Sequence, residues 1–255
     1  MEKCNVTLFV SPMGHDVDGV SALMRRWLQE TGLFRVHIAG LGRHAEESIQ
    51  SCMQNEEQVL QTGLFLFVCS GEGWEDEAAR RRLEQAVAAG TPILFSHGLH
   101  PCFADWPELE KMIGLLWRQT AWHGDFNRCQ VRMEPQDHPI TRGVADFETE
   151  DELFCALTNV HNVPLQVLAS AFSSAQLVSR WGHRGTDTWE PVLTVGQYGQ
   201  ARTVNFLLGH KWPFYTGHGL MEDSFIAFEP PAFKTLFLRS CEWAATGQVA
   251  ATGEG

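Results

Sequence analysis

The 255-residue chain has no apolar run that approaches the ~20 residues of a membrane-spanning helix. Its first residues, Met1-Glu-Lys-Cys-Asn-Val, contain no apolar signal core, so we expect a protein of the cytoplasm. Basic residues are few and unclustered: 19 Lys and Arg stand against 31 Asp and Glu, for a formal net charge of -12. This charge repels a phosphate backbone and an anionic bilayer, so neither nucleic acid nor a membrane is an expected partner.

Several motifs that carry well-known chemistry are also absent. The seven cysteines form no CxxC pair and their number is odd, which favours reduced thiols over a disulfide framework. The phosphate-binding patterns GxGxxG and GxxxxGKS/T do not occur, so the signal for a nucleotide is weak. No HxH or HExxH spacing is present. A centre for a divalent metal such as zinc or manganese would therefore have to be assembled from separate loops.

What the sequence does contain is an alternation of strand and helix over its first hundred residues. Short, almost continuous apolar runs predict buried strands, and the amphipathic or Ala-rich runs between them predict helices. The predicted strands are 6–10, 34–38, 64–69 and 92–96, and the predicted helices are 20–31, 45–60 and 75–89. This order predicts an α/β fold with a flavodoxin-like, doubly wound parallel sheet.

From Asn127 onward the pattern changes. Segments 129–133, 192–198 and 201–208 predict strands with tight turns, the span between the first two is turn-rich, and 230–246 predicts a closing helix. No Ser/Gly/Pro linker divides the chain, and it has no internal repeat. We expect one α/β domain over residues 1–247, with a β-rich elaboration in its C-terminal half, and a disordered tail at residues 248–255.

Three histidines stand just past predicted buried segments. These are His97, His123 and His210, which follow 92–96, 112–116 and 203–208. Loops beyond strand ends are where α/β folds bind ligands, so we expect the three side chains to converge in one cleft at the C-terminal edge of the sheet. Imidazole titrates near neutrality and ligates zinc-type metals, so this cluster fits either a general acid/base pair or a metal centre.

Other residues complete the candidate site. Asp151 and Glu152 precede an apolar pair, and either carboxylate could turn inward to orient a histidine or carry a proton. Tryptophans near the histidines in sequence offer flat apolar faces on which a sugar ring can pack. The candidate substrate-binding residues are these tryptophans and two residues on further loops at the same edge: Trp106, Trp122, Trp212, His15 and Gly71.

The order of these residues resembles a known family. The chain is similar to the trehalose-utilisation ThuA-like family in the succession Ala89-Gly-Thr-Pro-Ile-Leu-Phe-Ser-His97, Trp106, Trp122-His123, His138-Pro-Ile-Thr-Arg-Gly143, Asp151-Glu-Leu-Phe154, Tyr198-Gly-Gln-Ala-Arg202 and Leu208-Gly-His210. The HPITRG run with the later DELF is the most specific part. The resemblance covers nearly the whole chain and implies a fold like that of class I glutamine amidotransferases. It also implies a role in disaccharide catabolism, around 3-keto-sugar intermediates.

By this resemblance the three histidines and the two carboxylates match positions of the family pattern, residue by residue. The chain departs from that pattern at two places. Gly98-Leu99 follows the first histidine, where the family has Ser-Ala, and Lys211 follows the last histidine, where the family has Asp. Either departure could mean a different substrate or a lost activity.

Three functions remain open. The first is an enzyme that isomerises, epimerises or cleaves a keto-sugar or keto-glycoside by proton transfer, with His123 and His210 as base and acid. The second is a non-catalytic carbohydrate-binding protein. The third is an amidotransferase-like hydrolase, which is disfavoured because the elbow Phe95-Ser-His-Gly98 has no cysteine and Cys102 lies too far into the loop. The expected partner is a small-molecule sugar, and the sequence leaves open whether the protein is a homo-oligomer.

Overall fold

The computed structural model describes residues 2–11, 15–69, 72–98, 103–179, 181–211 and 225–250. Within these residues nine strands form one sheet, whose two halves differ in strand direction. In the parallel half the neighbouring strands are, in order, β2 (Phe34–Gly40), β1 (Cys4–Ser11), β3 (Thr62–Cys69), β4 (Ile93–Ser96) and β11 (Ala201–Phe206). This order is that of a flavodoxin-like sheet, as the sequence predicts.

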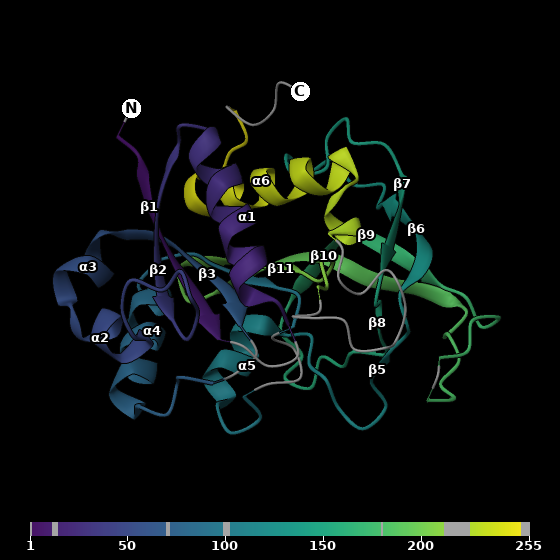
Figure 1. The fold of residues 1–255 in the computed structure, drawn as a ribbon, viewed down its shortest axis with the longest axis horizontal. Coiled ribbons are helices and arrows are strands. Elements are labelled where there is room, and N and C mark those ends of the chain that lie inside the picture. The colour runs from purple at the N-terminus through teal and green to yellow at the C-terminus, as the bar shows by residue number, and fades with distance from the viewer. Residues whose placement is uncertain are drawn as a thin grey trace.

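The second half of the sheet is antiparallel and continues from β11 without a break. Its strands are, in order, β10 (Thr188–Tyr198), β9 (Leu165–Ser173), β6 (Asn127–Met133) and β7 (Phe147–Asp151). Figure 1 shows these strands on the right, beyond the parallel strands. Two very short strands, β5 (Trp122–His123) and β8 (Phe154–Cys155), pair separately. The predicted β-rich elaboration is therefore confirmed.

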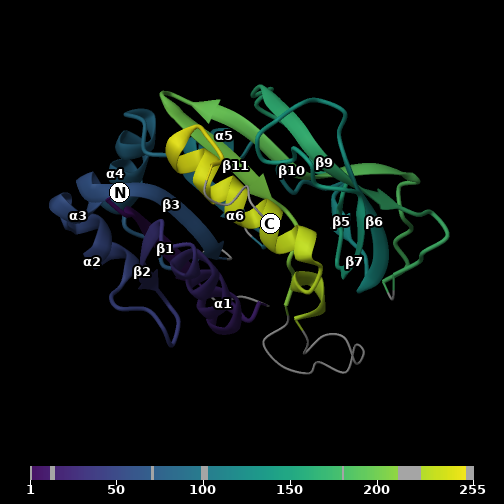
Figure 2. The ribbon, with the colours of Figure 1, turned by 90° about the horizontal axis from the view of Figure 1, so that it is seen from above.

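Helices cover both faces of the parallel half (Figures 1 and 2). One face carries α1 (Val17–Glu30) and α6 (Pro231–Thr246), with the short 3₁₀ helix η1 (Ile226–Phe228) beside them. The opposite face carries α2 (Ile49–Gln54), α3 (Glu56–Gln61), α4 (Glu77–Ala88) and α5 (Pro107–Ile113). No helix among the described residues is long and apolar enough to cross a membrane.

Strand β3 shows why the parallel strands are apolar throughout. Leu64, Leu66 and Val68 belong to the core under α1 and α6, whereas Phe65 and Phe67 point to the other face and pack in the core under α2, α4 and α5. Successive side chains of a strand face opposite ways, and here both faces are covered. Continuous apolar sequence is therefore the pattern that such a buried strand requires.

Two expectations about local structure are wrong. The single helix expected at 45–60 is instead α2 and α3, because Asn55 ends the first helix and its side chain accepts the Gln58 backbone N–H at 3.2 Å to cap the second. The span expected to be turn-rich contains β7, β8 and β9. In β9 the buried stretch Ala169-Ser-Ala171 consists of small residues, which carry little strand signal.

The expected C-terminal tail is described only in part. Ala250 donates its backbone N–H to Glu242 at 2.9 Å, so the tail is attached to α6 up to that residue. Residues 251–255 lie outside the described residues.

The break at Asn55 leads to a prediction about stability. Asn55→Ala removes the cap of α3 and should lower the free energy of unfolding by about 1 kcal/mol. Urea denaturation measures this change. The control is Gln54→Ala, an exposed position at the end of α2, which should change it by less than about 0.5 kcal/mol. Equal effects of the two substitutions would contradict the capping role.

Candidate functional site

His97 and His210 meet at the C-terminal edge of the parallel sheet. Strands β4 and β11 run side by side, and each histidine follows the end of one of them. The Nε2 atom of His97 lies 3.0 Å from the Nδ1 atom of His210, and both side chains are buried. Burial first, and then the neighbouring imidazoles of His97, His15 and His123, hold the pKa of His210 well below its usual value. The ring of His210 is therefore neutral at neutral pH.

The partners of these two rings assign their protons. The Nδ1 atom of His97 lies 2.6 Å from the backbone carbonyl of Leu207, which can only accept, so Nδ1 carries the hydrogen. In the neutral ring Nε2 of His97 is then an acceptor, and His210 donates its Nδ1–H to it. The basic nitrogen of His210 is therefore Nε2. One backbone carbonyl thus sets the tautomers of two rings.

His15 joins this pair from the loop after β1. The centroid of its ring lies 4.5 Å from that of His210 and 5.7 Å from that of His97. Gly98 makes room for it, because a Cβ there would lie 3.0 Å from two atoms of the His15 ring. Gly98 also has a φ of +101°, which side chains disfavour. A glycine at position 98 therefore has a steric reason in this chain.

The loop of His15 is fixed by Lys211. The Asp16 backbone N–H donates to the Lys211 carbonyl at 2.8 Å, and the Lys211 ammonium lies 3.2 Å from the Asp16 carboxylate. The Lys211 side chain is only 5% exposed. Asp16 in turn accepts the Gly19 backbone N–H and caps α1. Lys211 thus ties the loop after β1 to the loop after β11.

Asp151, the last residue of β7, holds the loop after β11 from the other side. Its carboxylate accepts the backbone N–H groups of Gly209 at 2.6 Å, His210 at 3.1 Å and Glu152 at 2.8 Å. Burial raises the pKa of Asp151 to about 6, and the three N–H groups oppose that rise. This aspartate therefore positions the backbone of the last histidine rather than an imidazole.

Glu152 is the carboxylate that contacts the histidines. Its Oε2 atom lies 3.2 Å from Nδ1 of His123 and 3.3 Å from Nδ1 of His210, and its side chain is 1% exposed. Of the two carboxylates that the sequence left open, the structure places Glu152 between imidazoles. His123 is thereby joined to the cluster made by His97 and His210.

His123 lies on a different element from the one expected. It does not follow a strand of the main sheet, because 112–116 is the end of α5 and a turn at Gly114, and the residue itself belongs to β5. Its Nδ1 lies 2.9 Å from the backbone carbonyl of Gly124, so Nδ1 carries the hydrogen and Nε2 is the basic nitrogen of the neutral ring. Its side chain is 27% exposed, whereas that of His210 is 5% exposed. His123 is therefore the more accessible of the two imidazoles that contact Glu152.

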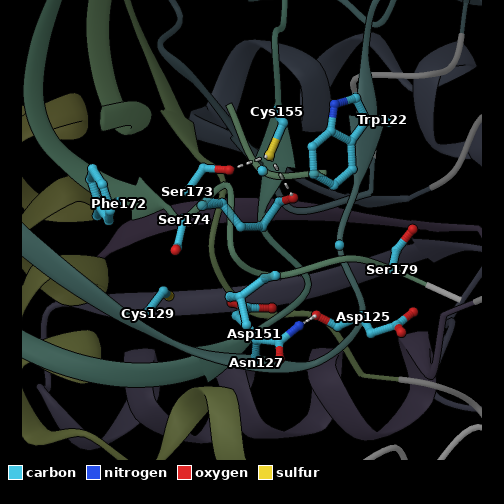
Figure 3. A pocket seen from close by; sticks show the side chains of 14 residues that line it. Trp122, Asp125, Asn127, Cys129, Asp151, Cys155, Phe172, Ser173, Ser174 and Ser179 are labelled. Atoms are coloured by element: carbon cyan, nitrogen blue, oxygen red, sulfur yellow. Dashed lines mark hydrogen bonds between the residues drawn. The ribbon is translucent and has the colours of Figure 1, made fainter. Parts of the chain in front are cut away.

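The strands around His123 have two distinct sides. His123, Glu152 and Phe154 face the cluster, and Phe154 stacks on His97 at 4.1 Å. The alternate residues line a pocket, shown in Figure 3, on the other side: Trp122, Gly124, Asp151, Leu153 and Cys155. Trp122 therefore faces away from the imidazole of His123, contrary to its expected place beside the histidines, and stacks on His183 at 5.6 Å.

Two tryptophans that the sequence interpretation missed lie against His123. The ring centroids of Trp117 and Trp181 are 5.9 Å and 5.2 Å from that of His123. Trp181 is 50% exposed, an unusual fraction for so large an apolar ring. It belongs to the turn-rich connection between β9 and β10, which carried no signal for a site.

The other expected site residues lie elsewhere. Trp106 is 3% exposed, packs against Trp74 in the core under α4 and α5, and donates its indole N–H to Glu84. It therefore has no face for a ligand, and its expected role is wrong. Gly71, Trp212 and Cys102 lie outside the described residues.

The HPITRG motif is structural in the described residues. The His138 carbonyl accepts the backbone N–H groups of Thr141 and Arg142, which closes a turn. The buried Arg239 of α6 donates to the carbonyls of Ile140 and Arg142 at 3.5 and 2.7 Å. The motif thus anchors the closing helix.

Comparison with known families decides the relationship. A family model described as trehalose utilisation, ThuA, matches residues 5–244. The chain belongs to the ThuA family. This membership connects it with trehalose utilisation and carbohydrate metabolism, and confirms the resemblance in the sequence. No protein with a curated description matches the chain.

Solved structures agree on the fold. A ThuA-like protein from Parabacteroides merdae is 20% identical with a TM-score of 0.77, and the match covers 98% of this chain and 92% of that one. A ThuA-like protein from Bacteroides uniformis is 13% identical with a TM-score of 0.68, and the match covers 94% of this chain and 91% of that one. The CTPS glutaminase domain from Trypanosoma brucei is 9% identical with a TM-score of 0.51, and the match covers 97% of this chain and 96% of that one. At these identities the likeness shows the fold alone, which is that of the glutamine amidotransferases.

The buried ion pair leads to the second prediction. Lys211→Met keeps the length of the side chain but leaves Asp16 without its ammonium partner, so the free energy of unfolding should fall by about 2 kcal/mol. Chemical denaturation followed by fluorescence tests it. Lys234→Met is a matched control, since Lys234 also lies over an aromatic ring but pairs with Glu30 at the surface. Lys234→Met should lower the free energy of unfolding by less than about 1 kcal/mol. An equal loss in the two variants would contradict the structural role of Lys211.

Proposed function

We propose that this ThuA-family protein is an enzyme that moves a proton on a keto-sugar or keto-glycoside. The observation that carries the proposal is the position of Glu152. A carboxylate that is 1% exposed lies within 3.3 Å of the imidazoles of both His123 and His210. A carboxylate behind an imidazole holds its tautomer and stabilises the imidazolium that forms when the ring takes a proton.

The chemistry that this arrangement supports is enolisation. A keto group acidifies the C–H bond on the adjacent carbon, so a positioned base can remove that proton. His123 serves as the base through Nε2, because its Nδ1–H faces the Gly124 carbonyl and Glu152. The electron pair of the broken C–H bond forms a carbon–carbon double bond, and the carbonyl oxygen takes the negative charge.

The fate of this enolate sets the reaction. The sugar is isomerised when the former carbonyl oxygen takes up a proton, the adjacent hydroxyl loses one, and the proton returns to the former carbonyl carbon. It is epimerised when the proton returns to its own carbon from the opposite face. In a keto-glycoside the electron pair can instead expel the glycosidic oxygen, which leaves as an alcohol after it takes up a proton. For delivery to the opposite face or to the leaving oxygen, His210 first takes up a proton from solvent at Nε2, and Glu152 beside its Nδ1 stabilises the imidazolium. One base and one acid therefore suffice for all three outcomes.

The surroundings of His123 suit a sugar. Trp181 presents a half-exposed aromatic ring beside the imidazole, and Trp117 lies on it as well. The C–H groups of a pyranose pack on such rings, while its hydroxyls need polar partners. This supports a carbohydrate as the ligand of the same site that holds the base.

An amidotransferase-like reaction has less support. A nucleophilic cysteine needs a lowered pKa, but burial raises the pKa of Cys52, Cys129 and Cys155 to about 12. After β4, where the sequence places the elbow, the chain has His97 and not a cysteine. Among the described thiols with an assigned pKa, none is activated as a nucleophile.

The test is proton exchange with solvent. The protein is incubated with a 3-keto-glycoside in deuterated water, and mass spectrometry should find deuterium on the carbon next to the keto group or a released aglycone. His123→Gln keeps hydrogen bonding but removes the titrating nitrogen, so the rate should fall by roughly 10²–10⁴. The control is His37→Gln, at a histidine of β2 outside the cluster, which should leave the rate unchanged.

Two results would overturn the proposal. One is a rate that His123→Gln leaves unchanged, which would remove this histidine from the chemistry. The other is neither exchange nor product with a series of keto-sugars, together with tight binding of an unmodified sugar. That second result would favour a carbohydrate-binding protein.

A further inference from the structure

His15, His97 and His210 offer one imidazole nitrogen each, and these three atoms lie within 4.8 Å of one another. They come from the loops that follow β1, β4 and β11, three strands of the parallel half of the sheet. We propose that these three histidines bind one zinc ion. The expected set from the sequence contained His123 in place of His15, but His123 reaches the cluster only through Glu152.

The donor chemistry selects zinc from the two metals that the sequence left open. Three imidazoles with room for a further ligand are a known catalytic zinc set, whereas manganese prefers oxygen donors. With zinc–nitrogen distances of about 2.0–2.1 Å, the three nitrogens of a tetrahedral site lie about 3.4 Å apart. The Nε2 atom of His97 is already 3.0 Å from the Nδ1 atom of His210. A small movement of His15 would bring its nitrogen, now within 4.8 Å of these two atoms, to the same spacing.

Each proposed ligand is held by a partner behind it. The Leu207 carbonyl accepts the Nδ1–H of His97 and leaves Nε2 for a metal, the usual arrangement of a zinc-bound imidazole. Asp151 fixes the backbone N–H of His210, and the pair of Lys211 and Asp16 fixes the loop of His15. The contact of the His97 ring is of the kind found behind metal-bound imidazoles, and the other two contacts fix the backbone that carries His210 and His15.

The proposed site borders a surface groove at His15. His15 and Asp16 line a surface groove together with Asp18, Arg43 and His44. His15 is only partly buried, in contrast to the other two histidines. A metal ion can therefore arrive from the side of His15, the ligand that has to move.

The proton between two of the ligands gives a further consequence. One hydrogen lies between Nε2 of His97 and Nδ1 of His210. A zinc ion bound by both atoms displaces this hydrogen, which moves to Nε2 of His210, so that the ring stays neutral. A bound zinc ion would polarise a carbonyl oxygen of the substrate. The metal site does not depend on the reaction proposed above, because its binding is measured without any substrate.

A second group of possible ligands provides the control. His37, Glu47 and Cys52 also cluster, but both ring nitrogens of His37 contact Glu46 and Glu47, and burial raises the pKa of Cys52 to about 12. A protonated thiol is a poor zinc ligand. The same substitution, histidine to glutamine, can therefore be made in each cluster.

The experiment is zinc binding by the full chain after removal of metal with a chelator. Competition with a chromophoric chelator and elemental analysis should show one zinc ion per chain. His15→Gln should weaken binding by more than about 100-fold, beyond the loss expected for an outer partner. His37→Gln should leave the affinity unchanged. Cobalt substitution should give the absorption of a tetrahedral ion in the wild type and in His37→Gln, but not in His15→Gln.

Three outcomes would overturn the site: a wild-type chain that binds no zinc, wild-type affinity in His15→Gln, or loss of zinc in His37→Gln. Far-UV circular dichroism checks that each variant is folded. Of the three ligands, His15 is the one whose replacement should disturb the fold least, because it lies on a loop and is partly exposed. Lys211→Met extends the test to the outer contacts, with an expected loss of about 10- to 100-fold. An unchanged affinity in Lys211→Met would contradict the role of this lysine in holding His15.

Discussion

The interaction on which the site depends is the contact between the Asp151 carboxylate and the backbone N–H groups of Gly209 and His210. It joins the end of β7, on the far edge of the antiparallel half, to the loop after β11 in the parallel half. Burial makes the charge of Asp151 costly, and three backbone donors offset that cost. With this contact in place, the next residue, Glu152, reaches the histidines.

The two halves of the sheet therefore contribute different things. The parallel half supplies His15, His97 and His210 from loops at the ends of its strands, as open α/β sheets generally do. The antiparallel half and the short β5–β8 pair supply Glu152 and His123. Buried polar networks of this kind are rigid only when their members are bonded, because the surrounding medium solvates them poorly. The backbone carbonyls of Leu207 and Gly124 meet that need for two of the rings.

Much of the parallel half is predictable from the sequence, because a strand covered on both faces must be apolar throughout. His97 and His210 could be selected for the same reason, since each follows such a strand. The place of His123 could not, because β5 has only two residues and its partner β8 lies more than thirty residues later. The choice between Asp151 and Glu152 also depends on strand alternation at the end of β7. The tryptophans were not predictable either, because closeness to a histidine in the sequence does not tell a core residue from a surface residue. Trp106 is buried in the core, whereas Trp181 is half exposed beside His123.

The site depends on oriented imidazoles, and their tautomers can be observed directly. A long-range ¹H–¹⁵N correlation spectrum of the histidine rings, recorded near neutral pH with a chelator present, reports which nitrogen carries the hydrogen. The partners assign it to Nδ1 in His97, His210 and His123, although free histidine in water favours Nε2. Three rings in the Nδ1–H form would match the structure. An Nε2–H form at His97 would contradict both the hydrogen-bond chain and the use of this Nε2 atom as a zinc ligand, and an Nε2–H form at His210 would contradict the hydrogen-bond chain.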